Sequence, residues 1–245
     1  MKPARVLATA TRVLQQLRRD HRSVALMLVV PIVLIALLKW VYWDDQDVFD
    51  RIGLPLLGIF PFVTMFLVTS VATLRERQSG TLERLLAMPL GKVDLLLGYQ
   101  IAFGLFATLQ AVLAVAVTVG LLGLSVAGPL WAVVLVAIMV ALLGTALGLA
   151  LSSLARTEFQ AVQFLPAVIL PQFLLCGLLA PRDSMQPILA ALSNLLPLSY
   201  AVDAMKAIAV ESSVSTETWR DLVIMVLFIL GFLIIGSATL RRRTP

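Results

Sequence analysis

Six apolar segments, each long enough to cross a lipid bilayer, dominate the chain. A helix needs about 20 apolar residues to span the hydrocarbon core, because each residue advances the helix by about 1.5 Å. The segments that meet this length are 24–43, 53–74, 97–124, 130–154, 162–179 and 222–240. The pattern therefore predicts an all-α integral membrane protein, whose transmembrane domain of six helices covers residues 24–240.

The segment 1–23 that precedes the first span is basic and amphipathic. Val6, Val13, Leu14 and Leu17 form its apolar side, and lysine and arginine residues lie between them. Such a helix buries its apolar side just below the lipid headgroups while its cationic groups stay in water. We therefore expect a cytoplasmic helix that lies in the interface of the membrane.

The segment 75–96 between the second and third spans combines charge with helical periodicity. Its apolar positions are Leu82, Leu85, Leu86 and Met88, its polar positions are Arg75, Glu76, Arg77, Glu83 and Arg84, and Pro89 and Gly91 follow. A leucine stripe opposite charged residues is typical of a surface helix, which proline and glycine end. The pattern predicts a short helix on the membrane surface, where a partner can bind.

The segment 180–221 between the fifth and sixth spans is too long for a simple turn. One helical stripe consists of Met185, Ile188, Leu189, Leu192, Leu195 and Leu196, and a second of Tyr200, Ala201, Ala204, Met205 and Ile208. Ser184 is a candidate N-cap of the first helix, and Pro197 is expected to end it. We expect two short helices at the outer leaflet, either on its surface or dipping in as a re-entrant hairpin.

Two spans carry residues with specific packing or functional potential. In the fifth span, Pro166 and Pro171 each remove a backbone donor, which indicates either a packing kink or a deformable helix beside a transport path. Gln163 and Gln172 on the same span favour the second interpretation, because amides are costly against lipid.

In the fourth span the small residues recur every four positions, which predicts close helix contact. They are Gly144, Gly148 and Ser152.

Lys39 is the one charged residue inside a predicted span. It lies near the outer end of the first span, next to the aromatic residues Trp40, Tyr42 and Trp43. Aromatic belts mark the headgroup level, and a lysine close to it can extend its ammonium group into water. The alternative is that Lys39 binds an anionic headgroup or substrate.

Composition supports the membrane assignment. The chain is 60% hydrophobic and only 13% charged, and its mean hydropathy is +0.98, whereas soluble domains are about one quarter charged. The single cysteine, Cys176, lies in an apolar run and has no partner for a disulfide or a thiolate metal site. These values exclude an ordinary soluble domain.

The distribution of basic residues predicts the orientation. With both termini inside, six lysine or arginine residues fall in the N-terminal segment, four in the 75–96 insert, one at Arg156 and three in the tail 241–245, against four outside. An excess of basic residues marks the cytoplasmic side. We therefore expect both termini to be cytoplasmic, and we attribute the net charge of +5 to topology and not to nucleic-acid binding.

Several kinds of chemistry are excluded because the sequence lacks the residue types or motifs that they need. His21, the only histidine, lies in the basic N-terminal segment, so histidine-based catalysis or metal binding inside the membrane is excluded. Asp and Glu all fall in predicted loops, which argues against a proton-coupled carrier. The only Gly-Lys pair, Gly91-Lys92, lacks the rest of a P-loop. The chain is therefore not expected to be an enzyme or to bind ATP itself.

Two motifs resemble a known family. The stretch RERQSGTLERLLAMPLGKVDLLLGY is similar to the cytoplasmic signature of type-2 ABC exporter permeases, and LLAPRDSMQPILAALSNLLPLSYAVDAMKAI is similar to the segment between the fifth and sixth spans in the daunorubicin-resistance-like branch. The resemblance covers nearly the whole chain. It implies a six-span half-exporter of a bacterial inner membrane that pairs with a second copy or a related permease.

The resemblance also implies partners and sites. Two cytoplasmic ABC ATPase subunits would carry ATP and Mg, and the helix at 80–88 would dock in a groove on the ATPase, with Glu76 and Arg77 in the adjoining gate. The ATPase-coupling residues implied are Glu76, Arg77, Gly80, Thr81, Leu82, Glu83 and Leu86. The first and fifth spans would face the dimer interface. Along the substrate path we place Lys39, Gln163, Pro166, Pro171 and Gln172.

The substrate remains open between several classes. Aromatic residues make up 7% of the chain, which favours hydrophobic drugs, antibiotics or lipid-like molecules, because polysaccharide exporters of this family tend to carry more aromatic residues along the path. Export of polysaccharide or lipid-linked glycan is one alternative. A membrane assembly factor or immunity protein that transports nothing is another.

Overall fold

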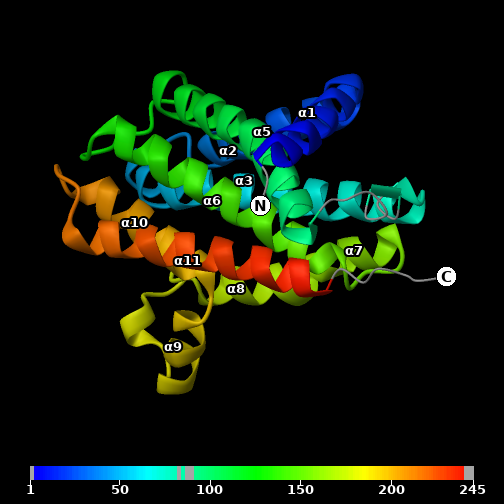
Figure 1. The fold of residues 1–245 in the computed structure, drawn as a ribbon. Helices are drawn as coiled ribbons and strands as arrows, with labels where there is room; N and C mark the ends of the chain where they lie inside the picture. The colour runs from blue at the N-terminus through cyan, green and yellow to red at the C-terminus, as the bar shows by residue number, and fades with distance from the viewer. Residues whose placement is uncertain (1–2, 82–83, 86–90, 240–245) are drawn as a thin grey trace.

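The computed structural model describes residues 3–81, 84–85 and 91–239, and all regular secondary structure within them is helical, with no strand. Six helical segments are long and apolar enough to cross a membrane (Figure 1). They are α2 (His21–Val41), α3 (Gln46–Gln78), α5 (Lys92–Gly120), α6 (Leu130–Ser152), the run Glu158–Leu175, and α11 (Thr216–Thr239). The predicted all-α fold with six transmembrane helices is confirmed.

The helices α3 and α6 form the centre of the bundle, because glycines let their backbones approach closely. A Cβ atom built on Gly144 would lie 2.3 Å from the carbonyl oxygen of Phe62, and one on Gly148 would lie 2.6 Å from that of Phe66. Only glycine fits at such distances, so the predicted contact ridge on the fourth span is confirmed. Ser152, the third member of the ridge, is also buried.

A buried amide joins three of the spans. Gln110 on α5 donates hydrogen bonds from Nε2 to the carbonyl oxygen of Met27 on α2 and to the hydroxyl of Thr64 on α3, both at 2.7 Å. Inside a membrane such hydrogen bonds hold helices together because lipid offers no competing partner. Gln110 therefore fixes α2 against the central helices, although α2 buries little else.

The first and fifth spans lie at the edge of the bundle. Only 17% of the most apolar stretch of each is buried within the chain, against 72% for α6. Large apolar side chains are exposed on both, among them Leu26, Val29 and Val33 on the first and Phe159, Val162 and Leu170 on the fifth. These two helices therefore offer extensive apolar surface to lipid or to another protein.

The N-terminal segment forms α1 (Pro3–Arg19), which lies beside α5 (Figure 1). Its buried residues are Val6, Thr9, Ala10, Val13 and Leu17. A Cβ atom on Gly98 of α5 would lie 2.6 Å from Cβ of Thr9, so the two helices touch at this glycine. The predicted helix is present, and its apolar side packs largely on protein. Its position relative to the membrane interface stays a prediction.

The fifth span is irregular at the positions of its prolines. It consists of α7 (Glu158–Phe164), the π-helical turn η1 (Leu165–Ile169) and α8 (Leu170–Leu175). Proline cannot donate to the preceding turn, and its ring crowds the carbonyl four residues earlier, so a widened turn accommodates it. Pro166 lies at the start of η1 and Pro171 near the start of α8.

The region between the fifth and sixth spans contains the two predicted helices, but their ends differ from the prediction. The 3₁₀ turn η2 (Arg182–Ser184) precedes α9 (Pro187–Asn194) and α10 (Pro197–Val210). Ser184 does not cap α9, because its hydroxyl donates to the carbonyl of Pro181 at 2.7 Å. Pro197 begins α10, since the fixed φ of proline suits the first helical position. The two helices meet at 91°.

Several acidic residues lie on helices, so the prediction that all of them occupy loops is wrong. Asp47 and Asp50 belong to the first turns of α3, and Asp45 caps its N-terminus by accepting from the backbone of Val48. Asp94 and Asp221 are buried near the starts of α5 and α11. The helices extend beyond the apolar segments because hydrogen-bonded polar residues continue them.

Candidate coupling site at the end of the second span

The last turn of α3 carries the residues that the sequence placed on a separate surface helix. The helix continues through Arg75, Glu76 and Arg77 to Gln78, and its C-cap is Ser79. The assignment of these three residues to the polar side of the following helix is therefore wrong. Gly80 has a φ of +71°, a conformation that glycine adopts without strain and that ends helices.

The segment after Gly80 is described only in part. Thr81, Arg84 and Leu85 are helical, and Leu85 is buried among apolar residues near α5. Leu82, Glu83 and Leu86 lie outside the described residues, as does most of the predicted docking helix at 80–88. Their coupling role stays a prediction. The connection between the second and third spans runs from residue 79 to 91 and is shorter than the predicted insert at 75–96.

On one side, the end of α3 is bound to α1 and α5. Arg12 Nη2 donates to Glu76 Oε2 at 2.9 Å and to the hydroxyl of Tyr99 at 2.8 Å, and that hydroxyl donates in turn to Glu76. Burial alone would lower the pKa of Arg12, but the partners Glu76 and Tyr99 raise it above its ordinary value. Arg12 therefore stays charged, and the three side chains form a closed cluster.

On its other side, the end of α3 is bound to the connection between the fourth and fifth spans. Arg75 pairs with Glu158 through two hydrogen bonds of 2.8 and 2.9 Å. Arg77 donates to the carbonyl oxygens of Ser153, at 2.7 Å, and Ala155. Gln78 donates to the carbonyl of Arg156 at 2.9 Å. The last turn of α3 thus touches the first residue of the fifth span.

The two ion pairs at the end of α3 differ in strength. The side chains of Arg12 and Glu76 are 27% and 15% exposed, whereas those of Arg75 and Glu158 are 58% and 45% exposed. A hydrogen bond to a charged group contributes about 1.5 to 3 kcal/mol when water is largely excluded, while an exposed ion pair contributes about 0 to 1 kcal/mol. The ion pair to α1 is therefore strong and the ion pair to the fifth span weak, while Arg77 adds part-buried hydrogen bonds to the connection that precedes the fifth span.

The proposed substrate-path residues of the fifth span do not share one environment. Gln163, Pro166 and Pro171 are exposed at the edge of the bundle. Gln172 is 3% exposed, donates to the carbonyl of Val168 at 3.1 Å, and has no hydrogen-bond partner for Oε1. Three of the four residues are thus free to meet a substrate or a second subunit, while Gln172 faces the interior of the chain.

Lys39 contacts the start of the second span. Its ammonium group donates to Gln46 Oε1 and lies 4.9 Å from the ring centroid of Phe49. Gln46 is held in turn by Asp50 at 2.7 Å and by the carbonyl of Gly123 at 3.0 Å. These contacts stabilise the turn between the first two spans, and a role of Lys39 in the substrate path stays a prediction.

A polar cavity between α10, α11 and the turn at η2 was not predicted from the sequence. Its volume is about 730 Å³, and its walls include Arg182, Asp203, Lys206 and Asp221. Arg182 pairs with Asp203, and Lys206 donates to the carbonyl of Gly177. The partners are far apart in sequence, so no local pattern indicates the cavity. The same is true of Arg12 at the candidate coupling site, whereas Tyr99 is the last residue of the family motif and had no role assigned to it.

Comparison with known proteins identifies the family. The model of the ABC-2 type transporter family matches residues 4–210, which extend from α1 to the end of α10 and include the last turn of α3. The chain belongs to the ABC-2 type transporter family. The predicted family is confirmed, while membership of the daunorubicin-resistance-like branch stays a prediction.

Curated relatives of this ABC-2 family chain come from Escherichia coli K12. It is 28% identical over 167 residues to the "Probable multidrug ABC transporter permease YbhR", a match that covers 68% of this chain and 45% of the relative. It is 28% identical over 166 residues to the "Probable multidrug ABC transporter permease YbhS", and this match covers 67% of this chain and 43% of the relative. It is 27% identical over 155 residues to the "Inner membrane transport permease YhhJ", and this match covers 62% of this chain and 41% of the relative. The chain thus spans less than half the length of these relatives.

Proposed function

We propose that this chain is the membrane-spanning permease subunit of an ATP-driven exporter, powered by a separately encoded ATPase that binds ATP and Mg. The observation that carries the proposal is the double attachment of the last turn of α3. The segment 79–91, where the ATPase is expected to bind, begins directly after that turn. Movement of this segment would therefore reach α1, through Arg12, and the fifth span, through Glu158.

The length and packing of α3 suit it to this task. It is a single helix of 33 residues, so it carries a displacement from one side of the membrane to the other. The weak pair Arg75–Glu158 is the contact that opens when the fifth span moves, and the stronger cluster around Glu76 keeps α1 attached. Coupling between distant sites requires an element with two discrete arrangements. The ion pair at the end of α3 provides such an element, because it can be either formed or broken.

The exposed apolar surfaces of the first and fifth spans support a second permease subunit as a partner. A second copy, or a related permease, would cover them and place Pro166 and Pro171 at the interface. The widened turn between these prolines makes the fifth span deformable there, which a transport path needs. Gln163 would then face the path between the two subunits.

Two lines of support indicate the substrate class. The relatives named YbhR and YbhS are described as probable multidrug permeases, and aromatic residues are sparse in this chain, at 7%. We therefore infer that the exporter moves hydrophobic drugs, antibiotics or lipid-like molecules outward across a bacterial inner membrane, with both termini cytoplasmic.

Copurification with the ATPase tests the proposal. The tagged permease should bring down an ABC ATPase whose hydrolysis rises with candidate drugs, and Glu83→Arg should weaken that association more than tenfold, because reversing a charge at a docking site costs about 2 to 5 kcal/mol. Glu217→Arg is the matched control, since Glu217 is exposed at the start of α11. A permease that binds no ATPase would instead favour a non-transporting assembly or immunity protein.

A further inference from the structure

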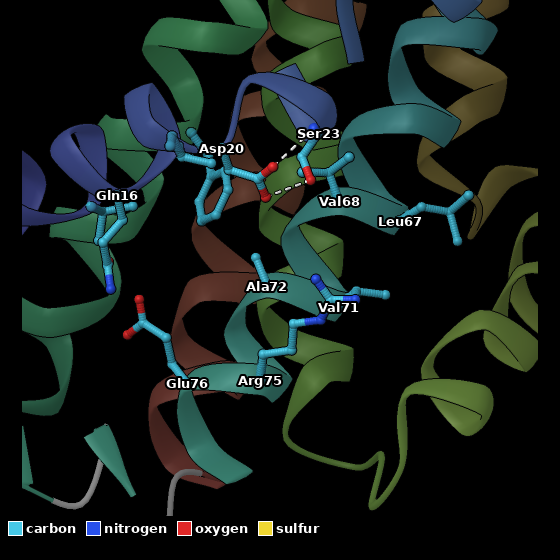
Figure 2. Close-up of a pocket in the computed structure, with 12 residues that line it drawn as sticks. Gln16, Asp20, Ser23, Leu67, Val68, Val71, Ala72, Arg75 and Glu76 are labelled. Carbon is cyan, nitrogen blue, oxygen red and sulfur yellow. Dashed lines mark hydrogen bonds between the residues drawn. The ribbon is translucent and has the colours of Figure 1, made fainter. Parts of the chain in front are cut away.

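A cavity of about 360 Å³ lies where α1 meets α2 and α3. Figure 2 shows Val68, Val71 and Ala72 of α3 along one wall, with Glu76 one turn further on and Asp20 at the junction of α1 and α2. Most of the lining is apolar, and the polar groups lie at the rim. The volume falls in the range of about 300 to 1,000 Å³ that small-molecule sites occupy.

The acidic groups at the rim are already satisfied. Asp20 accepts hydrogen bonds from the backbone and hydroxyl of Ser23, at 3.1 and 2.7 Å, which lower the pKa of its carboxyl group. Glu76 is held by Arg12 and Tyr99. Neither carboxylate therefore offers a free site for a cationic ligand.

The charged residues that flank Asp20, a residue of the cavity wall, along the chain are positive. Arg18, Arg19 and Arg22 flank Asp20 in the chain, are exposed, and form no hydrogen bond or ion pair with any residue that the structure describes. Arg22 is close enough to Asp20 for its charge to contribute to the lowered pKa of that carboxyl group. Arginine clusters directly beside a membrane span attract anionic lipid headgroups. The apolar cavity is thus followed, at Asp20, by a stretch of chain in which three exposed arginines outnumber one carboxylate.

We propose that this cavity binds an anionic phospholipid from the leaflet that α1 contacts. One acyl chain occupies the apolar cavity beside Val68, Val71 and Ala72. The phosphate lies against the arginines around residue 20. A zwitterionic lipid offsets its phosphate with its own ammonium group and therefore gains less from these arginines. A soluble anion gains nothing from the apolar walls, so the arrangement fits an amphiphile with a net negative headgroup.

Occupancy of the cavity affects the coupling site, because Arg75 and Glu76 form part of its wall. A bound lipid braces α1 and the start of α2 against the last turn of α3. If the proposed export function holds, ATP hydrolysis by the assembled exporter becomes dependent on anionic lipid. This consequence rests on the proposed function, whereas the binding site itself does not.

Lipid binding to the purified permease alone tests the proposal. Delipidated permease in detergent is titrated with phosphatidylglycerol or phosphatidylcholine of the same acyl chains, and the bound lipid is counted by native mass spectrometry. Phosphatidylglycerol should bind more tightly. Each arginine beside an anionic surface strengthens binding about fivefold, so replacing Arg18, Arg19 and Arg22 by Gln should weaken phosphatidylglycerol binding about a hundredfold.

A cavity-filling variant distinguishes the cavity from general attraction to a basic surface. Ala72→Phe should reduce bound phosphatidylglycerol, while Ala238→Phe on an exposed position of α11 and Arg156→Gln on an exposed loop should not. Equal binding of the two lipids, or unchanged binding in Ala72→Phe, would overturn the proposal. Displacement of the lipid by daunorubicin would also overturn it and assign the cavity to cargo. No ATPase is present, so a wrong export function would leave these results unaffected.

Discussion

At the scale of single residues, the carboxylate of Glu76 receives hydrogen bonds from two different helices. Arg12 comes from α1 and Tyr99 from α5, so one acidic group on α3 organises the meeting point of three helices. The arginine also lies 5.7 Å from the centroid of the tyrosine ring. Because the hydroxyl of Tyr99 both accepts and donates here, its removal leaves two charged groups short of one partner each.

We expect Tyr99→Phe to lower the free energy of unfolding by about 1.5 to 3 kcal/mol, the contribution of a hydrogen bond to a charged group. The measurement is the thermal unfolding midpoint of the purified permease in detergent. Tyr42→Phe is the control, because the structure describes no hydrogen bond of the Tyr42 hydroxyl. Equal midpoints for Tyr99→Phe and the parent would show that the cluster does not hold the helices together.

At the scale of elements, the glycine ridge between α3 and α6 makes a sharp prediction. Gly148→Ala places a methyl group 2.6 Å from a backbone oxygen of Phe66, which cannot rotate away. Overpacking of this kind costs about 1 to 3 kcal/mol, and the unfolding midpoint should fall accordingly. Gly231→Ala on α11 is the matched control, because its new methyl group would meet no atom within 4 Å. A Gly148→Ala variant as stable as Gly231→Ala would contradict the contact.

The prolines of the fifth span make a second prediction at this scale. Replacing both Pro166 and Pro171 by Ala restores two backbone donors and should convert the π-helical turn into regular helix. We expect membrane insertion to be unchanged and efflux to slow, because the straightened helix resists bending. Efflux from cells expressing equal amounts of each variant is the measurement. Parental efflux in the double variant would reduce the prolines to packing features.

At the scale of the whole molecule, the orientation in the membrane is the main untested expectation. Ser79 is exposed at the end of α3, and Ser213 is exposed in the connection between α10 and α11. With both termini cytoplasmic, an impermeant thiol reagent added to intact cells should label Ser213→Cys and spare Ser79→Cys. The native Cys176 is buried, so background labelling of this cysteine by the reagent should be low. The reverse labelling pattern would invert the topology.

The sequence predicts the spans well and their ends poorly, and both results have a physical reason. The length of an apolar segment indicates which residues lie in the hydrocarbon core. A helix, however, continues beyond that segment as long as its backbone groups are hydrogen-bonded and its ends are capped. Thus α3 reaches Gln78, four residues beyond the predicted span, and α11 begins at Thr216 and not at Leu222. The small residues of the fourth span indicate a close contact, yet nothing in their spacing names Phe62 and Phe66 as the partners.

The candidate coupling site was predicted only within the family motif, which runs from the end of α3 to the start of α5. Glu76 and Arg77 lie in that motif, and so does Tyr99, its last residue, to which the motif assigns no role, whereas Arg12 lies 64 residues from Glu76. The arginine was attributed to topology, because a basic N-terminal segment needs no further explanation. Pairings of this kind follow from how helices pack, so a single sequence does not contain a local signal for them.

The near-contact of the backbones at Gly144 and Gly148 also limits how the molecule can move. Sliding α6 along α3 would drive the glycine backbone into the carbonyl oxygens of Phe62 and Phe66, and packed interiors resist such deformation. The two helices are therefore expected to move together as one rigid unit. Under the proposed export function, movement between inward-open and outward-open states is expected in the lightly packed helices around this pair, so distances between probes on α3 and α6 should stay constant throughout turnover.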